Sequence, residues 1–331
     1  TAKINHKTEV RMLQLYVFRN SLKSFYAKYH SIIDKGIKYI ILFIAMMLIN
    51  LNLGYQTKLA VIHIPILLAI VGAFLPDMAG AVIVAVFLMI HLFAASFELA
   101  LLVGIIFILT FFLYYSFGKK DSILLIIVPI LFSIKIQYVI PLVVGLMGST
   151  VSIIPIMAGI LIYFTCIFAK QNIGVLTNTQ SVDIAQRYSQ AINGVFSNKT
   201  MLLFLVAFAL TTFIVYKVHK KNMDYAWQIA IAAGAITILI SVFAGDLIFD
   251  ISIPLLDFII GLVLSVIIAY VCNFFVFSVD YTRSEYVQFE DDDYYYFVKA
   301  VPKITITAAD KKIQSFSTNG KKKNKNNGGS E

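Results

Sequence analysis

The chain has 331 residues, of which 60% are hydrophobic and 14% are charged, and its formal net charge is +9. A soluble globular protein is about 45–50% apolar and about 25% charged. Many runs of this chain carry no charge over the length of a membrane-spanning helix. The composition therefore excludes an ordinary soluble domain and indicates an all-α polytopic membrane protein. We expect no nucleic-acid partner, because basic patches interleaved with aromatic residues are absent.

Residues 1–36 are polar and basic, and they predict an amphipathic helix. Apolar side chains recur there at spacings of three and four, which places them on one helix face: Leu15, Phe18, Leu22, Phe25, Tyr29 and Ile32. We expect this helix to lie at the membrane interface near anionic lipid headgroups. The alternative is packing on a partner protein. The apolar run that begins near Ile37 shows no signal-peptide cleavage site, so it is expected to be a signal anchor.

Ten apolar runs follow, and we expect about ten transmembrane helices, with a range of eight to ten. They cover residues 37–53, 60–75, 79–96, 99–117, 122–136, 138–152, 153–169, 201–216, 225–244 and 254–278. The three runs within 122–169 are short, since sixteen helical residues span about 24 Å against a hydrocarbon core of about 30 Å. Two crossings and one re-entrant half-helix are the alternative there, because irregular backbone is tolerated at membrane depth when it is buried.

A short phrase repeats three times and suggests repeated hairpin units. It reads Ile64-Pro65, Ile140-Pro141 and Ile253-Pro254, each with a Gly seven residues after the Pro. Met-Ala-Gly also occurs twice, at Met78–Gly80 and Met157–Gly159. We predict units of four helices (37–118), four helices (119–216, with a polar outer loop at 170–200) and two helices (217–279), all in one orientation. Chance is the alternative, because Pro is favoured at helix starts for structural reasons.

The distribution of Lys and Arg predicts the orientation. With the N-terminus, Lys119-Lys120 and Lys217–Lys221 inside, thirteen basic residues outside the long tail are cytoplasmic and five are external. This satisfies the positive-inside rule and places both termini in the cytoplasm.

Few ionisable residues lie in the apolar runs, and such residues are functional candidates because burying charge in a bilayer is costly. Asp257 could bind a proton or cation, pair with a Lys, or simply interact with the dipole at a helix start. His91 and Glu98, seven residues apart, could form a relay, or His91 could pack against a neighbouring helix. We find no motif for catalysis, cofactor or metal binding, and we predict that the protein is not an enzyme.

Residues 280–331 form a tail of different character, which we predict to be cytoplasmic and β-prone, with disorder from about residue 318. An acidic run is followed by aromatic residues, and the candidate docking residues are Glu290, Asp291, Asp292, Asp293, Tyr294, Tyr295 and Tyr296. Ile304 and Ile306 alternate with threonines in a strand pattern. This tail could bind a protein partner by strand addition, or the acidic run could be a solvated turn between strands.

The tail segment 285–303 and the segment Asp224–Trp227 resemble uncharacterised multi-pass membrane proteins of clostridial-type bacteria. The resemblance covers about a tenth of the chain and implies no activity and no site residues. It does imply a bacterial plasma membrane as the location.

Two functions remain open on the sequence alone. The first is a transporter or permease-like protein, suggested by short helices interrupted by Gly and Pro. Its scarce intramembrane charge favours an apolar or neutral cargo. The second is a membrane scaffold, or an integral subunit of an envelope complex, that docks partners through its N-terminal helix and its C-terminal tail.

Overall fold

The computed structural model describes residues 2–117, 121–174, 184–251, 253–276 and 284–302. Over these ranges the chain forms eleven α-helices, one short 3-10 helix and one two-stranded sheet. Their bounds are α1 Ala2–Asn52, α2 His63–Phe74, α3 Asp77–Ala95, α4 Phe97–Phe117, α5 Leu124–Ser133, α6 Val139–Met147, η1 Thr150–Ser152, α7 Ile153–Gln171, α9 Ile184–Phe196, α10 Lys199–His219, α11 Ala226–Phe249, α12 Leu255–Val276, β1 Glu285–Glu290 and β2 Tyr295–Ala300.

Among the described residues, five helical segments are long and apolar enough to cross a membrane: α3, η1 with α7, α10, α11 and α12. Three apolar segments are shorter, namely α2, α5 and the Phe97–Leu113 part of α4. These segments support the predicted all-α membrane-embedded class. The ten spans and the repeated hairpin units are not confirmed.

Local sequence explains several of the helix boundaries. The Pro of the repeated Ile-Pro phrase stands in the first turn of α2 and of α6, and Pro254 immediately precedes α12. Pro is favoured at such positions because the first helical N–H groups need no intrahelical acceptor. Ser96, with extended backbone angles (φ −159°, ψ 125°), separates α3 from α4. The first part of the phrase therefore marks helix starts in all three copies.

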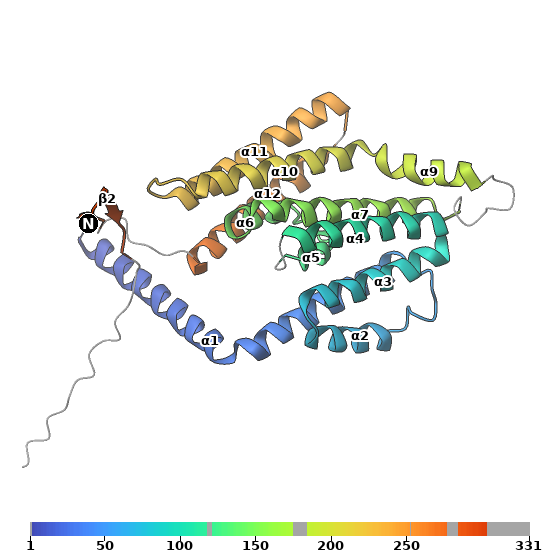
Figure 1. Cartoon of the computed structure of the whole chain (residues 1–331), viewed down its shortest axis with the longest axis horizontal. Helices are drawn as coiled ribbons and strands as arrows, with labels where there is room; N and C mark the ends of the chain where they lie inside the picture. Colours follow the sequence, from blue (N-terminus) through green and yellow to red (C-terminus); the bar gives the residue numbers. More distant parts are fainter. Residues whose placement is uncertain (1, 118–120, 175–183, 252, 277–283, 303–331) are drawn as a thin grey trace, which may run out of the picture.

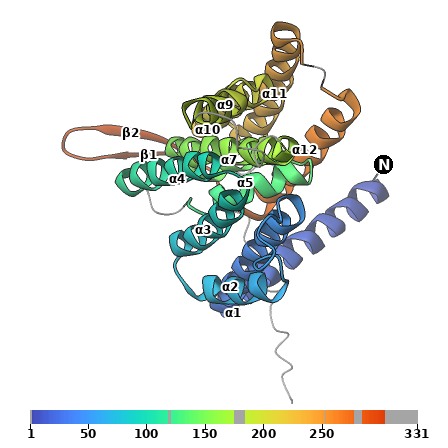
Figure 2. The ribbon, with the colours of Figure 1, turned by 90° about the vertical axis from the view of Figure 1, so that its right-hand side faces the viewer.

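The helices lie roughly side by side in an elongated bundle. Figures 1 and 2 show α1–α3 on one side, α4, α5 and α7 in the middle, and α10–α12 on the other side. At one end, which we call the Asp121 end, Lys38 of α1 pairs with Asp77 of α3 at 2.8 Å. At the opposite end, the α9 end, Lys170 of α7 donates to Asn52 of α1 at 2.8 Å.

Helices α5 and α6 form a hairpin that enters the bundle and returns to the end where it began. At the start of α5, the carboxylate of Asp121 accepts a hydrogen bond from Ser152, immediately before α7. Further along, a Cβ on Gly159 of α7 would lie 2.6 Å from Cβ of Val128 of α5. The two contacts join residue pairs that are equally far apart in the sequence, 121 with 152 and 128 with 159. Helices α5 and α7 therefore run parallel. Helix α6 then returns, because its C-cap Gly148 lies against Ser152 again.

The hairpin is too short to reach the α9 end. Helix α5 has ten residues and α6 has nine, which corresponds to about 15 Å and about 14 Å of helix. Helix α7 has nineteen residues, or about 28 Å. Of the three helices predicted within 122–169, the third agrees with α7. The first two end earlier than predicted, because the loop at 134–138 and Gly148 break them.

Buried apolar side chains form two clusters. The larger cluster contains residues of α4 to α7 and of α9 to α12, and it includes Ala85, Leu88 and Leu92 of α3. The smaller one joins α1, α2 and α3, and it touches α5 through Ile126. The two clusters meet along a seam at α3 and α5, because each of these helices contributes buried residues to both clusters.

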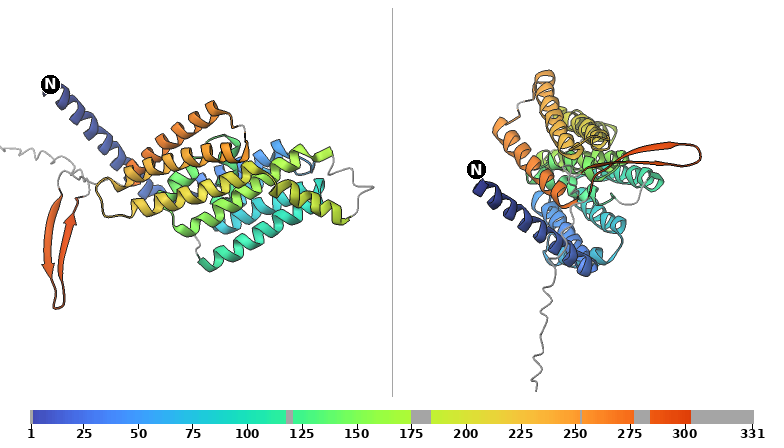
Figure 3. Two further views of the ribbon diagram at one scale, coloured as in Figure 1. Left: turned by 90° about the horizontal axis from the view of Figure 1, so that it is seen from above. Right: turned by 90° about the vertical axis from the view of Figure 1, so that its left-hand side faces the viewer.

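Two elements project from the Asp121 end (Figure 3). The N-terminal part of α1 is helical as predicted, and a kink at Tyr29 (φ −117°, ψ 15°) separates it from the part that joins the bundle. The tail forms the antiparallel hairpin β1–β2. The predicted strand around Ile304 and the predicted disorder from about residue 318 lie outside the described residues.

Candidate functional site

A chamber of about 640 Å³ lies at the seam between the two apolar clusters. Side chains of α1, α3, α4, α5 and α7 line it, and most of them are Ala, Val, Leu, Ile or Phe. Its more polar lining residues are Asn52, Ser133, Tyr163, Cys166, Lys170 and Gln171. Ligand sites of about 300–1,000 Å³ with mainly apolar walls and few polar groups are typical of proteins. We refer to this cavity as the α1/α7 chamber.

The chamber exists because the hairpin is short. Helix α5 fills the space between α1 and α7 near the Asp121 end, where Leu125, Ile126 and Pro129 form chamber wall. Beyond Ser133 the chain turns away, and no helix of the described residues replaces α5 between α1 and α7. Pro129 adds a polar feature to this wall, because it has no N–H to donate to the carbonyl of Leu125.

The polar residues of the chamber gather toward the α9 end. Asn52 is the last residue of α1, and Lys170 and Gln171 are the last two residues of α7. The Nζ of Lys170 donates to Oδ1 of Asn52 at 2.8 Å, so this contact bridges the gap that α5 leaves open. We call these three residues the chamber mouth.

Asp257, the first candidate of the sequence, forms an ion pair with the hairpin. Its Oδ2 lies 2.6 Å from Nζ of Lys135, which stands in the turn between α5 and α6. Lys135 has a left-handed backbone (φ 61°). The neighbouring Gly261 of α12 lies against the same turn, where a Cβ would be 3.0 Å from the carbonyl oxygen of Lys135. Asp257 therefore attaches the start of α12 to the tip of the hairpin, and pairing with a Lys was one of the predicted alternatives.

His91 is fully buried in α3 and serves a backbone group. Its Nδ1 accepts a hydrogen bond of 3.3 Å from the N–H of Gln56, in the irregular linker between α1 and α2. An acceptor nitrogen carries no proton, so this contact requires the neutral ring protonated at Nε2. The ring also packs edge-on against Phe87 at 4.9 Å between centroids. His91 thus satisfies a polar group of a linker that lies against the helices.

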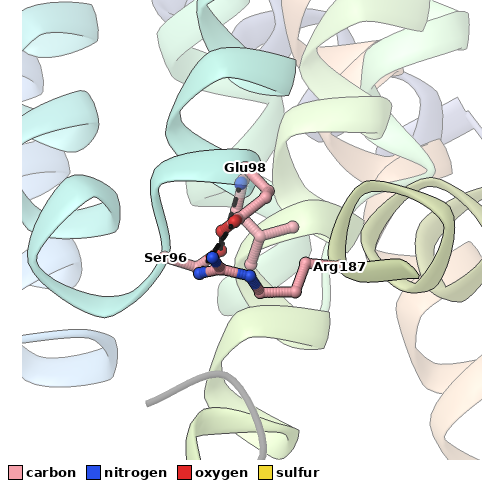
Figure 4. Close-up of polar contacts among 4 residues, drawn as sticks. Ser96, Glu98 and Arg187 are labelled. Carbon is pink, nitrogen blue, oxygen red and sulfur yellow. Dashed lines mark hydrogen bonds and ion pairs between the residues drawn. The ribbon is translucent and has the colours of Figure 1, made fainter. Parts of the chain in front are cut away.

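Glu98 lies in a different helix and has different partners. Its Oε2 accepts a hydrogen bond of 2.7 Å from Ser96, and its Oε1 lies 3.4 Å from Nη1 of Arg187 (Figure 4). Arg187 belongs to α9, so this largely buried ion pair holds α9 against the start of α4. The break at Ser96 separates Glu98 from α3, and no contact joins it to His91 among the described residues. The structure therefore does not bring the predicted relay together.

The acidic run of the tail is a turn, which was one of the two predicted alternatives. Oδ1 of Asp291 accepts hydrogen bonds from the backbone N–H of Asp293 and of Tyr294, and its Oδ2 accepts one from the hydroxyl of Tyr296. These hydrogen bonds, with that of Tyr296 the largest contribution, lower the pKa of Asp291. The candidate docking residues Glu290, Asp292 and Tyr295 are exposed on the same hairpin. Lys299 pairs with Asp224 at 2.7 Å, which joins the hairpin to the loop between α10 and α11.

Sequence reasoning missed the chamber and its mouth. Lys170 contributed only to the charge count, and Asn52 received no role. A possible signal was their position at the ends of two apolar runs that face the same side. Among the described residues, no group of three or more His, Cys, Asp or Glu side chains could hold a metal ion.

The chain matches no known family model, no curated protein and no solved structure. The chemistry of the chamber and of the exposed surfaces therefore has to carry the functional argument.

Proposed function

We propose that the chain is a transporter or permease-like membrane protein that accommodates a largely apolar molecule in the α1/α7 chamber. The observation that supports this most is the chamber itself, which combines apolar walls with a polar mouth at one end. A half-length helical hairpin beside a cavity is a way to place irregular backbone at membrane depth without exposing it to lipid. No catalytic role is part of the proposal.

The proposed topology has eight crossings and one re-entrant hairpin. The crossings are the second part of α1, then α2, α3, α4, α7, α10, α11 and α12, while α5 and α6 enter and leave on one side. This scheme keeps every basic cluster of the sequence in the cytoplasm, because a re-entrant hairpin changes no parity. The Asp121 end is then cytoplasmic and the chamber mouth is external. A bacterial plasma membrane remains the proposed location.

Packing of the two Met-Ala-Gly copies supports a relation between the first two units. Gly80 of α3 lies against Lys38 and Leu42 of α1, and Gly159 of α7 lies against Val128 of α5. In both units, the Gly of the third helix therefore packs on the first helix of the same unit. We propose that these units are parallel repeats, with α5 and α6 shortened in the second one.

Transport can be tested with two Trp variants of the purified protein. Ile167→Trp places a large ring in the chamber, whereas Ile108→Trp makes the same change on a side chain that is 69% exposed. We expect flux of apolar or amphiphilic fluorescent probes into liposomes to be lost in the first variant and kept in the second. Absence of flux and of ligand-dependent stabilisation in the wild type, across broad panels, would refute the transporter proposal.

A membrane scaffold is the second candidate, because exposed apolar surface lies at both ends of the chain. On the tail hairpin, Val287, Phe289, Tyr296 and Val298 share one face by strand register and are all exposed. A hairpin of two strands is marginal alone, so a protein partner would stabilise it. Deletion of residues 281–331 followed by affinity purification tests this function, since unchanged co-purifying partners would exclude tail-mediated docking.

The N-terminal helix is proposed to bind anionic lipid. All six side chains of its predicted apolar stripe are exposed: Leu15, Phe18, Leu22, Phe25, Tyr29 and Ile32. Burying such a stripe in the interface, with Lys23 and Lys28 near the headgroups, is the expected behaviour of a basic amphipathic helix. Loss of protease protection of residues 14–28 when anionic lipid is omitted from nanodiscs would support this binding. Equal protection in neutral lipid would contradict it.

A further inference from the structure

The mouth of the chamber carries a cation, Lys170, that has no acidic neighbour among the residues that the structure describes. Three other cations of the bundle are each paired with a carboxylate: Lys38 with Asp77, Lys135 with Asp257, and Arg187 with Glu98. Over the residues that the structure describes, no carboxylate lies within ion-pair distance of Lys170, and its hydrogen bond goes to the neutral amide of Asn52. No carboxylate of the described residues therefore pairs with the Lys170 side chain at the opening of the cavity.

An unneutralised ammonium beside an apolar cavity favours an anionic ligand group. Lys170 is exposed at the mouth, so its ammonium is accessible to a ligand head group that enters there. Hydrogen bonds between charged donors and acceptors are about twice as strong as neutral ones. The flexible stem of a Lys allows its ammonium to turn toward a ligand at the mouth. The amides of Asn52 and Gln171 provide further N–H donors to the same group.

The rest of the chamber fits one alkyl chain. Its walls between α1, α5 and α7 are apolar, with Leu48, Ile49, Ile130 and Ile167 among them. A methylene group is close in size to a water molecule, so the chamber of about 640 Å³ holds roughly twenty such groups. This is the size of one long chain and is less than the two chains of a bilayer phospholipid require.

We propose that the α1/α7 chamber binds a single-chain amphiphile with an anionic head group. Its alkyl chain lies between α1, α5 and α7, and its carboxylate or phosphate head meets Lys170 and Asn52 at the mouth. This inference rests on the proposed transport function and names its cargo class. It replaces the neutral cargo expected from the scarcity of intramembrane charge.

The head group, not the chain, provides the selectivity. Lipid tails are as apolar as the chamber walls, so moving a chain from bilayer to chamber brings little hydrophobic gain. An acid and an alcohol of equal chain length therefore differ mainly in their contact with Lys170. Charge-assisted hydrogen bonds predict a difference of roughly tenfold or more in affinity.

The test measures binding of hexadecanoate, hexadecyl phosphate and hexadecanol to the full chain in neutral-lipid nanodiscs. We compare wild type with Lys170→Gln and with Lys199→Gln, a matched control at the same end whose amine donates to the carbonyl of Phe249. The expected result is roughly tenfold tighter binding of both anions than of the alcohol. Lys170→Gln removes this preference and Lys199→Gln retains it. Phosphatidic acid, with two chains, serves as a further probe and is expected not to compete.

Separate outcomes overturn the inference and the function on which it rests. If all three single-chain probes bind equally in every variant but Ile167→Trp abolishes their binding, the anionic cargo is wrong and an apolar cargo remains. If phosphatidic acid competes as well as hexadecyl phosphate, the single-chain assignment is wrong. If Ile167→Trp leaves binding of every probe unchanged, the chamber is not the site, and the proposed function fails with the inference.

Discussion

The packing of the re-entrant hairpin makes a matched pair of Gly variants informative. Gly159 and Gly80 occupy the same place in the two Met-Ala-Gly copies, but their surroundings differ. A Cβ at Gly159 would lie 2.6 Å from Cβ and 2.8 Å from Cγ1 of Val128. Cβ of Val128 is bonded directly to the backbone of α5, so no side-chain rotation moves it away. A Cβ at Gly80 would lie 3.4 Å from Cε of Lys38 and 3.5 Å from the methyl groups of Leu42, which are flexible ends.

We therefore expect Gly159→Ala to destabilise the protein relative to Gly80→Ala. Overpacking a helix contact costs about 1–3 kcal/mol, while Ala is favoured over Gly inside a helix by about 1 kcal/mol. The helix-propensity contribution is similar in both variants, so the difference between their free energies of unfolding should be about 1–3 kcal/mol. Gly80→Ala alone should be neutral or slightly stabilising.

The assay is reversible unfolding of both variants in the same detergent micelles, with ligand binding in the chamber as a second readout. Because α5 forms part of the chamber wall, its displacement by a methyl group on Gly159 should also weaken binding of hexadecanoate. Equal stability of the two variants would refute the parallel packing of α5 on α7. Gly36→Ala, where a Cβ would meet nothing within 4 Å, controls for helix propensity at a third place.

Three further predictions concern polar contacts. Lys135→Met should lower the free energy of unfolding. In a double-mutant cycle, the double variant with Asp257→Asn should lose less of this free energy than the sum of the two single variants. Additive losses would contradict the ion pair. Arg187→Gln should release α9 and speed hydrogen exchange of its amides, while exchange in α11 stays unchanged. The pKa of Asp291 is lowered and that of Tyr296 is raised by their shared hydrogen bond. The turn should therefore persist at neutral pH. It should lose this hydrogen bond as the pH falls through the folded-state pKa of Asp291 or rises through that of Tyr296. Constant NMR chemical shifts of the turn amides at both pH extremes would contradict this prediction.

The sequence predicted most helices well, because apolar runs and prolines are local signals. The run predicted at 79–96 became α3, Asp77–Ala95, and the run at 201–216 lies within α10, Lys199–His219. The tail also followed its local pattern, since the acidic residues proved to be the turn of a hairpin.

The second unit was predicted less well because its shape depends on tertiary contacts. Equal division of 122–169 produced three crossings, but chain length alone does not show that α5 stops at Ser133 and that α6 returns. The contact of Asp121 with Ser152 and the fit of Val128 on Gly159 decide this arrangement. Neither contact leaves a periodic signal in the sequence.

The candidate polar site was only partly predictable for a similar reason. Asp257 was correctly singled out as a charged residue near a helix start, but its partner Lys135 lies 122 residues away in the chain. The spacing of seven between His91 and Glu98 suggested one helix face. The extended backbone at Ser96 separates the two, and the linker residue Gln56 and the α9 residue Arg187 become their partners.

One structural feature connects these observations. The turn of the hairpin lies near the start of α12, and its Lys135 pairs there with Asp257 of the first turn of that helix. This exposed ion pair attaches the hairpin tip to α12. On the other side of the same tip, the missing length of α5 opens the chamber. Its mouth residue Lys170 has no acidic partner among the residues that the structure describes. The two cations therefore have different roles. The ammonium of Lys135 pairs with a carboxylate and holds the hairpin in place, whereas we propose that the ammonium of Lys170 pairs with a ligand.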